Sequence, residues 1–150
     1  MSYGLMTDVI ALVATIDPDA YTTGTQLSDA IDMAFHRRLM TTIYAGTLGS
    51  SGVLNAVLTS SATSGGTYTQ ITGKSITALT QAGTDSDKQA IINLAAAEMP
   101  AGHRFVKVSC RLTVATSDYG AASYGDRPRF TGASPTANIL DLASVDEIVA

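Results

Sequence analysis

The chain has 150 residues and a mass of 15.5 kDa, which is enough for one domain with its own hydrophobic core. Hydrophobic residues make up 45% of it and charged residues 15%, a composition that excludes an intrinsically disordered protein. The formal net charge of -4 and the pI of about 4.8 give no general attraction to nucleic-acid phosphates or anionic lipids, so we expect neither nucleic acid nor a membrane as a partner.

Cysteine usage and the start of the chain indicate where the protein is made. Cys110 is the single cysteine, so no intramolecular disulfide can form, and its place in an alternating apolar run predicts a buried side chain rather than a nucleophile. Residues 1–6 lack the basic start of a signal peptide, and the apolar stretch 9–16 is too short to span a bilayer. We therefore expect synthesis in a reducing cytoplasm.

The first twenty residues predict an extended arm or an edge strand closed by a turn. They end in Asp17-Pro18-Asp19, and a proline biases the residue before it away from helix. Apolar side chains in residues 22–32 are too sparse to settle the period, and we expect a short strand there.

The middle of the chain predicts short strands separated by turns. Residues 38–48 are rich in β-branched and aromatic side chains, as in a central strand, and the run 52–60 is its expected partner. A hairpin turn is expected at Gly65-Gly66, after which an alternating pattern resumes at residue 68.

The clearest strand signal lies in residues 104–115, after an expected strand at 88–94 and a short helical turn near 95–99. Alternate residues of this run are apolar, namely Val106, Val108, Cys110, Leu112 and Val114. A period of two places these side chains on one face of a strand, so that Lys107 and Arg111 face water.

The end of the chain predicts a last strand and an arm. Residues 119–130 have strand character, residues 131–138 are loop-like, and residues 139–150 mix apolar side chains with carboxylates. This amphipathic segment is too short to be stable unless it docks on something. We expect residues 131–150, like residues 1–20, to form an arm, which contacts a neighbouring subunit through Leu140, Leu142, Val145 and Ile148.

These elements predict an all-β fold. The chain contains about seven or eight short strands at a spacing of roughly ten residues, without a long helix or a strand-helix alternation. Such a pattern indicates an antiparallel β-sandwich, and among sandwiches we favour the jelly roll. No linker or internal repeat divides the chain, so we expect one domain over residues 1–150.

Residue types that carry catalysis are few and scattered. The two histidines, His36 and His103, stand in different segments with no nucleophile motif beside either. One cysteine and two separated histidines do not form a zinc pattern, and Asp85 and Asp87 lack the spacing of a calcium loop. We therefore expect no enzyme, no cofactor and no metal; catalysis would need His36 or His103.

Four stretches combine short β-branched strands with polar or Pro-Ala-Gly turns. They are residues 44–48 (YAGTL), 54–61 (LNAVLTSS), 64–73 (SGGTYTQITG) and 100–108 (PAGHRFVKV). Together they resemble the small virion proteins of bacteriophages and prophages that decorate capsids, a likeness that covers about residues 22–116. The resemblance implies a jelly-roll-like sandwich, a homo-oligomer with a trimer favoured, and attachment to the lattice of the major capsid protein through loops and terminal arms.

The leading hypothesis is thus a non-enzymatic structural protein of the virion, made in the host cytoplasm and placed on the capsid surface, where it decorates or stabilises the capsid. The alternative is a carbohydrate- or surface-binding β-sandwich module of a phage tail or fibre. In that case Tyr119 and Tyr124 are expected to line a shallow binding site.

Overall fold

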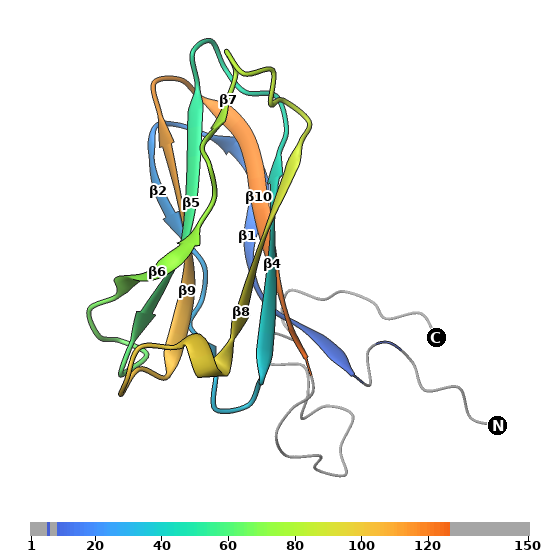
Figure 1. Cartoon of the computed structure of the whole chain (residues 1–150). Coiled ribbons are helices and arrows are strands. Elements are labelled where there is room, and N and C mark those ends of the chain that lie inside the picture. The colour runs from blue at the N-terminus through green and yellow to red at the C-terminus, as the bar shows by residue number, and fades with distance from the viewer. Residues whose placement is uncertain (1–5, 7–8, 127–150) are drawn as a thin grey trace, which may run out of the picture.

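The computed structural model describes residue 6 and residues 9–126 of the chain. Over this range the chain forms two antiparallel β-sheets that pack face to face (Figure 1). The first sheet consists, in spatial order, of β1 (Ile10–Tyr21), β10 (Ser117–Asp126), β4 (Arg38–Ala45) and β8 (Gln89–Ala95). The second sheet consists of β2 (Gly24–Leu27), β9 (Phe105–Thr113), β5 (Val53–Ser61) and β6 (Thr69–Ser75), with β3 (Ile31–Asp32) beside β9 and β7 (Leu79–Thr80) beside β5.

The core is the layer of side chains between the two sheets. β9, which lies inside the second sheet, contributes a row of side chains to this layer. Four alternate residues of β9 are almost fully buried: Val106, Val108, Cys110 and Leu112. Fully burying a side chain of this size stabilises a fold by about 1.5–3 kcal/mol. The predicted alternation is confirmed as far as Thr113, but Val114 is 66% exposed and has a φ of 78°, because the strand has ended and the chain bends toward β10.

The structure corrects the predicted N-terminal arm. Residues 10–20 belong to β1, which is the edge strand of the first sheet and the other possibility that the sequence left open. Its inward side chains Ala11, Val13 and Ile16 are buried, so this part of the chain helps to build the core.

The turn predicted at Pro18 is a bulge within β1. The register with β10 shifts between Ile16 and Asp19, so that Asp17 and Pro18 lie opposite Gly120. A Cβ atom on Gly120 would lie 2.9 Å from the Cα atom of Pro18, a distance that side chains do not tolerate. Proline is compatible with a sheet at such edge bulges, because no ladder hydrogen bond is lost there.

The predicted pairing of residues 38–48 with residues 52–60 is wrong. β4 pairs with β10 and β8, whereas β5 lies in the second sheet and pairs with β9, β6 and β7. Both strands turn apolar residues toward the same core, and such local patterns do not say which sheet a strand joins. The hairpin around Gly65 and Gly66 is confirmed, since it connects the antiparallel pair β5 and β6.

A polar contact joins the two sheets beside β8. The Nζ atom of Lys74 donates to the carbonyl oxygen of Asn93 at 2.8 Å and lies 2.7 Å from Oε2 of Glu98. Glu98 ends the 3-10 turn η2 (Ala96–Glu98), which confirms the short helical turn predicted there. The hydrogen bond from the backbone of Ala95, and then the contact with Lys74, lower the pKa of Glu98.

The predicted all-β fold is thus confirmed as a sandwich of antiparallel sheets. The arm expected over residues 131–150 lies outside the described residues.

The inward and outward sides of β9 give a stability test. Val108→Asp buries an unpaired carboxylate and is expected to lower the free energy of unfolding by several kcal/mol or to abolish folding. Lys107→Asp removes a contact in which Nζ lies 4.8 Å from the centre of the Tyr68 ring. It is expected to lower the free energy of unfolding by only about 1 kcal/mol. Thermal unfolding followed by circular dichroism compares the two variants; similar melting temperatures would contradict the assigned faces.

Candidate interaction surface

The two sheets present outer faces of different character. The outer face of the second sheet carries mainly polar and charged side chains, among them Thr25, Asn55, Thr59, Lys107 and Arg111. Leu27, Val53, Val57 and Phe105 are apolar exceptions on it. A polar outer face is what an antiparallel sheet normally turns to water.

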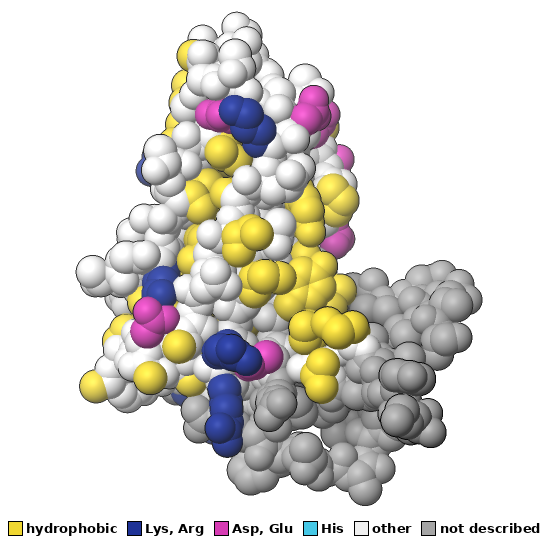
Figure 2. All heavy atoms as spheres, turned by 45° about the vertical axis from the view of Figure 1, so that its right-hand side comes forward, with side chains coloured by type: hydrophobic (Ala, Val, Ile, Leu, Met, Phe, Trp, Pro, Cys, Tyr) yellow, Lys and Arg dark blue, Asp and Glu magenta, His cyan; other side chains and the backbone are white. Residues whose placement is uncertain are grey.

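The outer face of the first sheet is apolar instead. Cross-strand pairing places Leu12 beside Tyr124, and Tyr124 beside Met40. Together with their neighbours they form a surface that we call the apolar face: Ile10, Leu12, Met40, Tyr44, Ile91 and Tyr124. Met40, Tyr44 and Ile91 are 40%, 41% and 58% exposed, and hydrophobic side chains gather on the side of the molecule that Figure 2 brings forward. Contiguous exposed apolar surfaces of this kind mark sites of interaction.

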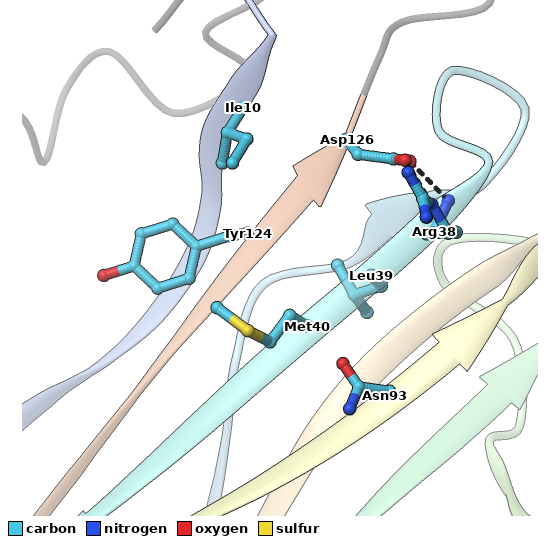
Figure 3. Close-up of a pocket in the computed structure, with 7 residues that line it drawn as sticks. All are labelled: Ile10, Arg38, Leu39, Met40, Asn93, Tyr124 and Asp126. Atoms are coloured by element: carbon cyan, nitrogen blue, oxygen red, sulfur yellow. Dashed lines mark hydrogen bonds and ion pairs between the residues drawn. The ribbon is translucent and has the colours of Figure 1, made fainter. Parts of the chain in front are cut away.

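A shallow hollow of about 210 Å³ lies at one end of the apolar face (Figure 3). Its lining combines Ile10, Met40 and Tyr124 with the polar side chains of Asn93 and Asp126. Ile10, the first residue of β1, is paired with Asp126, the last residue of β10. The start of the first strand, β1, and the end of the last strand, β10, therefore lie side by side at this hollow.

Polar contacts fasten β10 to β4 beside the hollow. The carboxylate of Asp126 accepts from the backbone N of Arg38 at 2.7 Å and from its Nε atom at 2.5 Å. Because the Arg38 side chain is largely exposed, the ion pair itself contributes at most about 1 kcal/mol. Its role is to fix the positions of the two strand ends.

His36 lies buried under the same strand ends, where it is only 1% exposed. Its Nδ1 atom is 3.4 Å from the carbonyl oxygen of Asp126, and its ring packs so closely on Gly125 that a Cβ there would lie 2.4 Å from Nδ1. Burial lowers the pKa of His36 from its usual 6.5. The ring is therefore neutral at pH 7 and acts as a packing element.

The two tyrosines of the predicted glycan site lie on opposite faces of β10. Tyr119 points inward, is 2% exposed, and packs against Tyr21 with ring centres 4.7 Å apart. Tyr124 lies on the apolar face; burial and then the neighbouring Tyr44 raise its pKa. Two residues five apart along a strand point to opposite sides, so the predicted pair does not form one site.

The other candidate residues do not come together. His103 hydrogen-bonds through Nδ1 to Oγ of Ser60 at 2.8 Å, separately from His36. Cys110 is buried as predicted, and burial raises the pKa of its thiol to about 12. The carboxylate of Asp85 is engaged by the backbone of Thr80 and by Lys88, at 3.0 and 2.9 Å. Within the described part of the chain, no three potential metal-ligating side chains cluster.

The predicted interface residues Leu140, Leu142, Val145 and Ile148 lie outside the described residues. Among residues 9–126, no helix has the length and apolar character needed to cross a bilayer. The sequence matches no model of a known protein family. It also matches no curated protein sequence.

Sequence reasoning missed the apolar face, although β4 carried a signal for it. Leu39 and Ile43 fall on one parity of this strand, and Met40 and Tyr44 on the other. A strand that is apolar on both parities indicates a sheet covered on both sides. The burial of His36 had no local signal, because it depends on Gly125, far along the chain.

The buried neutral ring of His36 predicts a loss of stability in acid. A lowered folded-state pKa means that the unfolded chain binds the proton more readily, so the stabilisation is complete above pH 6.5 and is lost as the pH falls toward the folded-state value. His36→Phe keeps a flat ring on Gly125 but does not titrate, and it is expected to remove this dependence. Urea unfolding between pH ~5 and ~7.5 measures it; His103→Gln is the control and should retain the slope. An unchanged slope in His36→Phe would refute the assignment.

Proposed function

We propose that the chain is a non-enzymatic structural protein of a phage virion, which decorates or stabilises the capsid by binding the lattice of the major capsid protein as a homo-oligomer. The observation that supports this best is the apolar face. It is a surface of exposed Met40, Tyr44 and Ile91 that extends over adjacent strands of a regular sheet. Such a surface suits contact with protein rather than enclosure of a small substrate.

The family resemblance supports the virion part of the proposal. The stretches that carry it fall on the end of β4, on β5, on the turn and strand of β6, and on the turn that leads into β9. They therefore belong to one sandwich and to three of the connections between its strands.

The strand order supports the jelly-roll part. With β2 and β3 counted as one interrupted strand, and β6 and β7 as another, each sheet has four strands. In chain order, the first sheet then contains the first, eighth, third and sixth strands, and the second sheet contains the second, seventh, fourth and fifth. Eight strands in two sheets with this connectivity are typical of jelly rolls, which occur in viral capsids and in lectins.

Co-sedimentation tests the proposal. The chain is co-expressed with the major capsid protein of the phage or prophage genome that encodes it, and the shells are separated on a density gradient. We expect the chain to travel with assembled shells, and deletion of residues 139–150 to weaken this binding without changing the β-sheet signal in circular dichroism. Shells that never carry the intact chain would refute a capsid role, and full binding by the truncated chain would refute a role of the C-terminal arm.

The hollow beside Tyr124 favours a second candidate function, that of a carbohydrate-binding module. It combines an aromatic side chain with Asn93 and with the Arg38–Asp126 pair, the groups that bind sugar rings and hydroxyls. A glycan array would then give a signal that Tyr124→Ala abolishes. Replacement of Gln89, on the same sheet but outside the lining of the hollow, is the control and should keep the signal. Silence of the intact chain would exclude glycans on the array as ligands.

A further inference from the structure

The apolar face is a preformed surface that the rest of the described chain leaves uncovered. Its six residues lie on four adjacent strands whose register is set by backbone pairing, so it needs no rearrangement to bind. Its centre carries no charge: Thr42, Asn93 and Ala122 lie between its apolar side chains, and Arg38 and Asp126 stand paired at one end. A suitable occupant is therefore an apolar segment whose own charges fall outside the contact.

The chain continues from the edge of this surface. Asp126 lines the hollow, and residues 127–150 follow it. Within them, residues 139–150 contain the apolar side chains Ile139, Leu140, Leu142, Val145, Ile148 and Val149. Asp141, Asp146 and Glu147 make the same segment acidic. At this end of the sheet, Arg38 lines the hollow but is paired with Asp126, and the exposed Arg37 precedes β4. The segment thus matches the face in apolar content, and its carboxylates must lie outside the contact.

We infer that the apolar face binds the C-terminal segment, residues 139–150, of a second copy of this chain, so that the copies assemble by exchanging these segments. This inference deepens the proposed function, because it names the surface and the segment through which the copies associate. Exchange of an identical element between protomers is a low-cost route to oligomers.

The direction of β10 favours a second copy over the same molecule. The strand runs off the end of the sheet at Asp126, away from Tyr124 and Met40 (Figure 3). The linker of residues 127–138 spans up to about 40 Å when extended, against roughly 26 Å for the eight residues of β4. It is therefore long enough to reach a neighbouring molecule.

Two single substitutions in the full-length chain test the two halves of this contact. Ile91→Asp places a charge on the apolar face, on its edge strand β8, and Leu142→Asp places one in the C-terminal segment. Each is expected to raise the dissociation constant of self-association by about tenfold or more, because a carboxylate is buried at the contact. Light scattering coupled to size exclusion measures this against the 15.5 kDa of one chain.

Leu27→Asp is the matched control. Leu27 is 57% exposed, almost the same as the 58% of Ile91, and it also lies on an edge strand, but on the outer face of the second sheet. This variant should associate as the unsubstituted chain does, and all three variants should keep the β-sheet circular-dichroism spectrum of the parent. A monomeric parent chain, or equal effects of Ile91→Asp and Leu27→Asp, would overturn the inference.

Mixing the two defective variants separates exchange between copies from docking within one molecule. The Leu142→Asp chain keeps an intact face and the Ile91→Asp chain keeps an intact segment, so together they can form one sound contact. We expect the mixture to give a species of twice the single-chain mass that neither variant forms alone. Absence of this species would refute exchange between copies. These measurements use the chain without capsids. They therefore test exchange between copies independently of the co-sedimentation experiment, which tests capsid binding.

Discussion

Burial of a single layer of side chains between two sheets is the constraint on which this fold depends. The long strands each turn one row of mainly apolar residues inward, and a polar group that enters the layer without a partner lowers stability. Thr41 and Ser123 satisfy each other across adjacent strands, with their Oγ1 and Oγ atoms 2.8 Å apart. The Nε2 atom of His36 and the hydroxyl of Tyr119 are buried without a partner among the described residues, and each such group lowers stability by about 1–3 kcal/mol.

The sequence predicts this layer where the signal is local. A period of two over residues 104–115 is enough to identify β9 and its buried side, because the alternation of a strand depends on its own backbone alone. Pairing is a different matter, since β4 and β5 are neighbours along the chain but lie in different sheets. The turn predicted at Pro18 was wrong for the same reason. A proline is accommodated within a strand only where the neighbouring strand leaves room for a bulge. Here Gly120, about a hundred residues away, leaves that room.

The candidate surface was only partly predictable for a related reason. Tyr124 stood out as an aromatic residue, but its neighbours Met40 and Leu12 come from strands distant in sequence, and only the sheet register brings them together. The double apolar parity of β4 was a local signal that the outer side of the first sheet is apolar as well as the inner side. The extent of the apolar face is not encoded near β4, because it depends on which strands lie beside β4 in the sheet.

The β1 edge of the first sheet is protected against pairing with another strand, which favours contacts through the apolar face. A free edge strand pairs readily with another chain unless it is interrupted or charged. β1 has both protections, since Pro18 interrupts its ladder and the flanking Asp17 and Asp19 are exposed carboxylates. Addition of a strand along β1 is therefore disfavoured over that stretch. The adjacent apolar face carries no proline or unpaired charge at its centre that would disfavour a contact. A sheet that protects its edge and exposes an apolar face is suited to side-chain packing against a partner, rather than to strand addition.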